Sequence, residues 1–139
     1  MRRSKKPNKC GNRKVTVNGI TYDSKKEYKR HQVLMLLEKA GKITDLQRQV
    51  RFNLIPAQYE TVETGEFYKI GAKKGQPKTK KVCVEHSVVY VADFVYTENG
   101  KQTVEDVKGY RDPSTSVYAY FVMKRKLMLY IHGIRIKEV

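Results

Sequence analysis

Two aspartates and a lysine in the second half of the chain form the pattern with the clearest chemical meaning. Asp93 interrupts an apolar segment, and Asp106 and Lys108 lie on the next segment along the chain. Between the two segments stands Asn99-Gly100, a pair that readily adopts the two positive φ angles of a type I′ turn. The two segments are therefore predicted to form a hairpin, in whose register Asp93 falls directly opposite Asp106.

This pairing predicts a cation site. Opposed side chains in an antiparallel pair have Cβ atoms about 4.5–5.5 Å apart, and two carboxylates there repel unless a divalent cation joins them. Mg²⁺ suits such a pair, with Mn²⁺ as the other candidate, because Mg²⁺ takes one or two protein carboxylates plus waters and phosphate oxygens. Lys108 shares the face of Asp106, where it could orient or deprotonate a water or neutralise charge on a phosphate. The structural alternative is that Asp93 caps a turn and that a bulge breaks the register.

Two further acidic residues are candidates of lower rank. Glu105 points to the opposite face from Asp106 in this register and ranks well below it. Glu27 follows Ser24 at the spacing of a capping box, so it could simply complete a helix start. It also shares a helical stripe with His31 and Leu34, which would aim it into the molecule. The two interpretations of Glu27 stay open and do not exclude each other.

The elements around these residues predict a mixed α/β domain in which helices cover a sheet. A small hairpin is expected over 15–22, and a helix from Ser24 to about Ala40 that is apolar nearly all round over 33–37 and hence deeply packed. Residues 57–81 are polar and basic and are expected to form a long loop or a ragged hairpin extension. The remaining expected elements are strands over 43–54, 82–96 (one or two), 102–110 and 134–139, and a helix over 116–131.

Charge points to a polyanionic partner. The 139 residues carry 29 Lys and Arg against 14 acidic residues, a formal net charge of +15, so nucleic acid is the first expectation and an anionic membrane surface the second. No apolar run is long enough to span a membrane. Residues 1–14 are expected to be a basic flexible arm. The candidate DNA contacts are Arg2, Arg3, Lys5, Lys6, Lys73, Lys74, Lys80, Lys81 and Lys124.

The sequence gives less support to other kinds of functional site. Two cysteines are too few for a disulfide scaffold and favour a reducing compartment such as the cytoplasm. Cys83 and His86 have a spacing seen in zinc sites, but only Cys10 or distant histidines could complete the set. The three histidines show no His-Asn-His pattern, and a phosphate-binding Gly-rich loop is absent.

Together these residues resemble the PD-(D/E)XK nuclease superfamily. The motif is Asp93 followed by Asp106-Val107-Lys108, with Ala92 in place of the proline. The element order from Ser24 onward is similar to that superfamily's restriction-endonuclease-like αβββαβ core, here preceded by the small hairpin. Segments 22–27, 41–49, 92–96 and 105–109 resemble a family of small phage and prophage proteins thought to be endonucleases and sometimes labelled Holliday junction resolvases.

The resemblance implies a function and a role for each matching residue. It implies a nuclease-like domain over residues 15–139 that hydrolyses DNA with Mg²⁺ or Mn²⁺, in the host cytoplasm if the protein is phage-encoded. Asp93 and Asp106 would bind the metal, Lys108 would be the catalytic lysine, and Glu27 would stand beside the metal as a third acidic residue. Gln49 matches a recurrent glutamine of the first strand and joins the candidate DNA contacts. Cutting a junction symmetrically would favour a homodimer. The competing hypothesis is a basic DNA-binding protein without catalysis, such as a phage regulator or packaging accessory.

Overall fold

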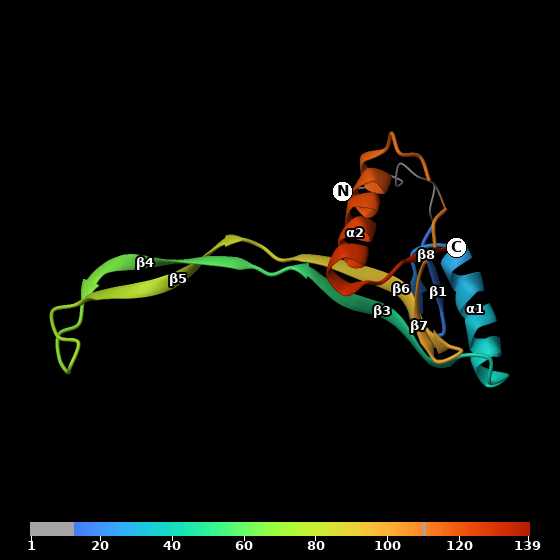
Figure 1. Cartoon of the computed structure of the whole chain (residues 1–139), viewed down its shortest axis with the longest axis horizontal. Helices are drawn as coiled ribbons and strands as arrows, with labels where there is room; N and C mark the ends of the chain where they lie inside the picture. Colours follow the sequence, from blue (N-terminus) through green and yellow to red (C-terminus); the bar gives the residue numbers. More distant parts are fainter. Residues whose placement is uncertain (1–12, 110) are drawn as a thin grey trace, which may run out of the picture. The chain divides into compact units, whose positions relative to one another are not determined.

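The computed structural model describes residues 13–109 and 111–139, and it divides the chain into two compact units (Figure 1). The first unit contains the chain up to Phe52 together with Val91–Val139, and the second unit is Asn53–Tyr90. The two helices and most of the strands belong to the first unit. The elements are β1 (Val15–Val17), β2 (Ile20–Tyr22), α1 (Lys25–Lys39), β3 (Thr44–Ile55), β4 (Gln58–Phe67), β5 (Pro77–Glu85), β6 (Val88–Glu98), β7 (Lys101–Asp106), α2 (Ser116–His132) and β8 (Lys137–Glu138).

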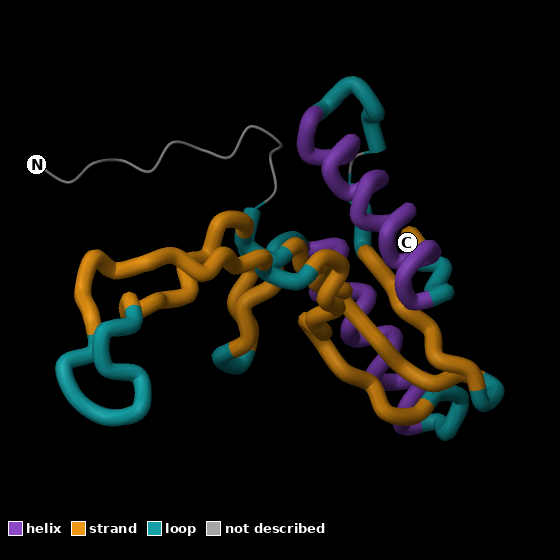
Figure 2. Tube along the Cα trace, turned by 60° about the vertical axis from the view of Figure 1, so that its left-hand side comes forward, coloured by secondary structure: helices purple, strands orange, loops and turns teal. Residues whose placement is uncertain are grey.

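A four-stranded mixed sheet forms the centre of the first unit. Its strand order is β3-β6-β7-β8, with β6 and β7 antiparallel and β7 and β8 parallel. The short β1–β2 hairpin precedes it, with Asn18 and Gly19 at positive φ in the turn. In Figure 2 the helices and the strands of this unit can be followed by colour. The predicted α/β class with a preceding hairpin is confirmed.

Helix α1 covers one face of the sheet through a narrow stripe of side chains. Ser24 caps the helix start, since its hydroxyl accepts from the Glu27 amide at 3.1 Å. The residues of α1 that are buried are Glu27, His31 and Leu34, which is the stripe the helical period predicts. Leu34 packs against Ile43 of the following loop and Phe94 and Tyr96 of β6 in the core cluster.

The prediction that α1 is deeply packed is wrong. The side chains of Val33, Met35 and Leu36 are exposed, Leu36 to 67%. The physical reason is that this helix contacts the rest of its unit on one side, so only the residues of one stripe can be buried. An apolar run of consecutive residues cannot by itself reveal how many sides of a helix are covered.

Helix α2 begins at a Thr115 cap, whose hydroxyl accepts from the Tyr118 amide, and ends at Gly133 in the left-handed conformation (φ 66°). Its buried residues are Phe121 and Met128. The predicted bounds of this helix are confirmed to within a residue. Across the described parts of the chain, no helix has the length and apolar character needed to cross a membrane.

The second unit contains a hairpin of two regular strands. The segment predicted as a long loop or a ragged hairpin extension forms β4 and β5, which pair antiparallel from Gln58 opposite Glu85 to Phe67 opposite Pro77 with two register shifts. A loop over the whole of 57–81 is therefore wrong, and the hairpin interpretation is right. Cross-strand pairing holds these polar residues in strands although little of either strand is buried.

Candidate functional site

The β6–β7 hairpin has the register that the Asn99-Gly100 turn predicts. Both turn residues have positive φ, 50° and 74°, and the strands pair from Glu98 opposite Lys101 to Phe94 opposite Glu105. The recorded pairs stop at Phe94 and Glu105, and Asp93 and Asp106 are the next residue on each strand. The ladder ends there because the Val107 amide donates to Asp93 Oδ2 at 2.8 Å instead of to a strand neighbour. The strand therefore stops at Asp106, short of the predicted end at 110.

Asp106 and Lys108 form a close ion pair beside helix α2. Asp106 is buried, and Lys108 Nζ lies 2.6 Å from its Oδ1. The same ammonium group lies 3.8 Å from the centroid of the Phe121 ring, a cation–π contact that restrains the lysine further. The lysine is thus held on the face of Asp106, as the strand period predicts, by a charge on one side and an aromatic ring on the other.

The carboxyl group of Asp93 is placed where a negative charge is unfavourable. Burial, followed by the nearby charge of Asp106, raises the pKa of Asp93 to about 7, and the charge of Glu27 adds to this effect. The hydrogen bond from the Val107 amide and the charge of Lys108 lower the pKa only in part. The charges of two other acidic residues, Asp106 and Glu27, therefore disfavour the ionised form of Asp93.

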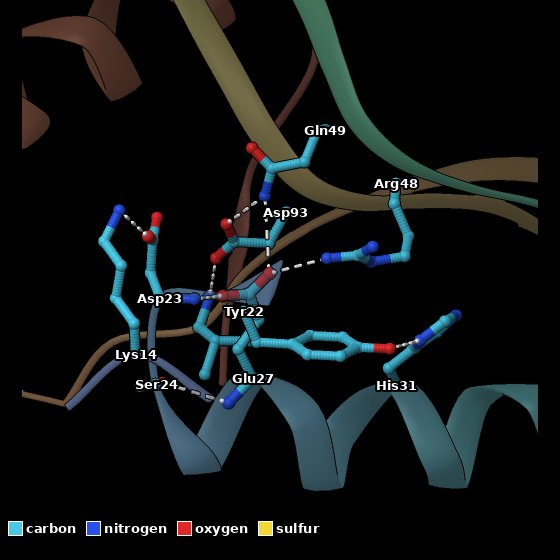
Figure 3. Close-up of polar contacts among 10 residues, drawn as sticks. Lys14, Tyr22, Asp23, Ser24, Glu27, His31, Arg48, Gln49 and Asp93 are labelled. Carbon is cyan, nitrogen blue, oxygen red and sulfur yellow. Dashed lines mark hydrogen bonds and ion pairs between the residues drawn. The ribbon is translucent and has the colours of Figure 1, made fainter. Parts of the chain in front are cut away.

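Glu27 joins the first helix to this region (Figure 3). Its carboxylate is buried and accepts from the Asp23 amide at 2.8 Å, from Arg48 at 3.3 Å and from Gln49 Nε2 at 3.4 Å. The amide that Glu27 reaches is that of Asp23, one residue before the position expected for a capping box. Both interpretations of Glu27 therefore hold in part: it supports the helix start and it faces the other carboxylates.

Gln49 links Glu27 to Asp93. Its side-chain amide nitrogen lies 3.4 Å from Glu27 Oε1 and 3.3 Å from Asp93 Oδ1, and Figure 3 shows both contacts as dashed lines. The backbone of Gln49 has φ 52°, the left-handed region that is uncommon for a residue with a side chain. Such a conformation inside a strand costs on the order of 1 kcal/mol or more and clusters at functional sites.

Arg48 is a site residue that sequence reasoning missed. Its guanidinium pairs with Glu27 and stacks 4.3 Å from the centroid of the Tyr22 ring. Burial, followed by the positive charge of Arg48, lowers the pKa of neighbouring His31, whose Nδ1 lies 2.8 Å from the Tyr22 hydroxyl. One signal was available in the sequence: Arg48 occupies the strand parity of Val50, Phe52 and Leu54, where a charge needs a partner.

Glu105 belongs to a separate network on the other face, as predicted. It lies opposite Phe94 in the ladder and is fully buried. Arg30 donates to both of its oxygens, at 2.8 and 2.6 Å, the Tyr96 hydroxyl donates at 2.6 Å, and Lys137 pairs at 3.1 Å. Burial alone would raise the pKa of Glu105, but these hydrogen bonds lower it overall. Because these partners occupy both of its carboxylate oxygens, Glu105 has a structural role in the core.

The candidate DNA contacts fall in different parts of the chain. Arg2, Arg3, Lys5 and Lys6, with most of the predicted 1–14 arm, lie outside the described residues. Lys73, Lys74, Lys80 and Lys81 are exposed in the second unit, and Lys124 lies on α2 with Nζ 5.1 Å from the Tyr120 ring centroid. Among the candidates within the described residues, Gln49 is the one whose side chain contacts the carboxylates of Glu27 and Asp93. For these residues DNA contact stays a prediction.

The donor set can be compared with what a metal ion requires. Within residues 13–109 and 111–139, no three His, Cys, Asp or Glu side chains are grouped so that they could hold one ion together. Cys83 Sγ and His86 Nδ1 lie 3.7 Å apart as a pair only. Asp93 and Asp106 offer two carboxylates whose charges interact, and their role as metal ligands stays a prediction. The role of Glu27 as a third ligand stays a prediction.

The fold and the site define a mixed α/β protein that carries two neighbouring acidic residues and a lysine at the end of a central hairpin. The chain belongs to the family described as "Protein of unknown function (DUF1064)", whose model matches residues 7–134. No curated protein and no solved structure matches the chain.

Proposed function

We propose that this protein is a metal-dependent DNA endonuclease. The observation that carries the proposal is that Asp93 and Asp106 directly follow the last paired residues of the hairpin and lie close enough for the charge of Asp106 to raise the pKa of Asp93, with Lys108 2.6 Å from Asp106. A sheet that served only as a scaffold would gain nothing from two facing carboxylates, because they destabilise each other. The formal charge of +15 supports DNA as the substrate, since its phosphates would compensate that charge.

Asp93 and Asp106 would hold Mg²⁺ or Mn²⁺. When bound there, such an ion polarises a phosphate oxygen and makes a water easier to deprotonate. Gln49 and Glu27 orient Asp93 through the Gln49 amide, and Arg48 holds Glu27 in place. Lys108, restrained by Asp106 and Phe121, would position a water or stabilise the negative charge that develops on the phosphate. The resemblance to PD-(D/E)XK nucleases implies products with a 5′-phosphate and a 3′-hydroxyl.

The test is cleavage by the purified full chain. Supercoiled plasmid, linear duplex, single strands and a four-way junction are each incubated with Mg²⁺, with Mn²⁺ and with EDTA. We expect cleavage with either metal and none with EDTA, and products that DNA ligase can rejoin. Asp93→Asn and Lys108→Met should lose cleavage, whereas Glu98→Gln, an exposed change in the same hairpin, should keep it.

Two outcomes would contradict the proposal. If wild type binds DNA but cuts none of the substrates with either metal, the protein is a DNA-binding protein without catalysis. If Asp93→Asn cuts as well as wild type, the activity belongs to another site or to a contaminant. The junction and duplex arms would also show which DNA structure is preferred.

A further inference from the structure

The second unit carries a concentrated positive charge at one end of its hairpin. From Phe67 to Val84 the chain contains six lysines and no acidic residue. The lysines are Lys69, Lys73, Lys74, Lys78, Lys80 and Lys81. We call residues 67–84 the basic tip. Most residues of β4 and β5 are exposed on both sides of the two-stranded ribbon. One lysine of the tip, Lys78, forms a close ion pair with an acidic residue of the same unit, Glu66.

The basic tip also exposes four large apolar side chains, of which Ile70 and Phe67 are the most exposed. Ile70 is 84% exposed and Phe67 57% exposed. Because the Ile70 side chain is exposed to solvent, it buries almost no apolar surface in a core. Its exposure costs free energy in water unless a partner covers it, and contiguous exposed apolar groups often mark binding surfaces.

The turn that contains Ile70 is held by backbone hydrogen bonds. The Tyr68 amide donates to Gln76 O at 3.0 Å and the Gly75 amide donates to Tyr68 O at 2.9 Å. Gly71 and Gly75 take φ angles of 85° and 84° that other residues rarely adopt. Lys73 and Lys78 place their ammonium groups 5.8 and 5.9 Å from the Tyr68 ring centroid. Backbone hydrogen bonds thus define the turn that contains Ile70, and the Tyr68 ring lies near two of its lysines.

We propose that the basic tip binds in a groove of duplex DNA, with its lysines on the phosphates and Ile70 inserted as an apolar wedge against a base step, so that the duplex bends. Two-stranded ribbons fit DNA grooves, and an isoleucine or phenylalanine wedge partly unstacks a step and kinks the helix. The positive charge favours DNA over a second copy of this chain as the partner, because each copy has a formal net charge of +15 and two copies repel each other. The inference rests on the DNA-binding part of the proposed function and is independent of hydrolysis.

The experiment measures bending and binding separately, in EDTA so that no cleavage occurs. A duplex of about 30 bp carries a donor dye at one end and an acceptor at the other, and energy transfer reports the end-to-end distance. We expect wild type to shorten that distance. Ile70→Gln should lose most of the shortening while its DNA affinity changes by less than about threefold. Leu36→Gln is the matched control, since Leu36 is 67% exposed on α1, and it should behave as wild type.

The lysines are tested through the salt dependence of binding. The double variant Lys73→Gln, Lys74→Gln should weaken affinity and reduce the slope of log K against log salt by about 2, because two phosphate contacts are lost. The same charge loss at the end of α1, Lys39→Gln with Lys42→Gln, should leave the slope nearly unchanged. If both double variants change the slope equally, the charge acts without a defined site and the proposal fails.

Three further outcomes would overturn the proposal. Wild type could bind without shortening the duplex, or both Ile70→Gln and Phe67→Gln could bend it as wild type does. A wild-type dimer could become a monomer with Ile70→Gln while bending persists, which would assign the tip to a protein contact. Measuring wild-type cleavage with Mg²⁺ beside wild-type bending in EDTA separates the two proposals. A wild type that bends the duplex but cuts no substrate keeps this inference and removes the endonuclease, whereas a wild type that cuts but does not bend the duplex removes this inference and keeps the endonuclease.

Discussion

Replacing Asp93 by asparagine should stabilise the metal-free protein at high pH and not at low pH. The pKa of this carboxyl is raised from an ordinary value of 3.8 to about 7. A carboxyl whose pKa rises on folding contributes stability below its unfolded pKa, and that contribution is lost as the pH rises through the folded pKa. A shift of about 3 units corresponds to at most about 4 kcal/mol, and less here because solvent reaches part of the group.

The substitution also has a cost. Asp93 Oδ2 accepts from the Val107 amide and Oδ1 from Gln49. Asparagine offers one acceptor oxygen, so one of these hydrogen bonds is lost at about 1 kcal/mol. The net expectation for Asp93→Asn in EDTA is a gain of about 1–3 kcal/mol in the free energy of unfolding at pH 8, and a loss of about 1 kcal/mol at pH 4.

The assay is urea unfolding of wild type and Asp93→Asn across pH 4–8.5 in EDTA. The quantity that matters is the difference between the two proteins, because other titrating groups such as His31 are common to both and cancel. Glu98→Gln, on an exposed position of the same hairpin, is the control and should show no pH-dependent difference. With Mg²⁺ at 100 times its Kd, wild type should gain about 2.7 kcal/mol and Asp93→Asn should gain none.

A difference that does not change with pH would refute the reasoning. If Asp93→Asn is less stable than wild type by the same amount at pH 4 and pH 8, the carboxylate is a satisfied structural acceptor. A wild type indifferent to Mg²⁺ at pH 8 would then remove the argument for a cation site as well.

Three other predictions concern the residues around this hairpin. Glu105→Gln should destabilise the fold by about 3–5 kcal/mol in urea unfolding, because Arg30 and Lys137 lose a buried counter-charge; a loss below 1 kcal/mol would show that the network is dispensable. Lys108→Met should reduce the cleavage rate by a factor of about 10²–10⁴ while DNA affinity in EDTA changes little, and a parallel loss of affinity would make the lysine a binding residue instead. Gln49→Glu should reduce cleavage more than Gln49→Ala, since it adds a negative charge between Glu27 and Asp93; equal activity in all three proteins would exclude a positioning role for this side chain.

Much of the fold could be predicted from local sequence because it depends on local chemistry. Asn99 and Gly100 readily adopt the positive φ angles of a tight turn, and this turn determines the register of the hairpin. Ser24 and Thr115 cap helices through amides three residues away. The stripe of Glu27, His31 and Leu34 follows from the helical period. Each of these features is decided by residues within a few positions of one another.

The composition of the site was only partly predictable. Asp93, Asp106 and Lys108 could be placed on one face because a single hairpin contains all three. The contact of Glu27 with Gln49, and of Gln49 with Asp93, joins α1, β3 and β6, and no pattern within one element specifies which neighbour it meets. Arg48 was missed for this reason, although its position among apolar residues signalled a buried partner.

Tertiary structure also decided which surfaces are covered. The apolar run 33–37 looks buried in sequence, yet Leu36 is exposed because α1 packs on one side only. The composition of residues 57–81 left a long loop and a hairpin extension both open, and the structure forms paired strands there because the hydrogen bonds of a ladder come from the backbone and do not require apolar side chains. Sequence determined the turns, the caps and the hairpin register through local contacts. Burial and the Glu27–Gln49–Asp93 link depend on how separate elements pack, and only the folded chain could decide them.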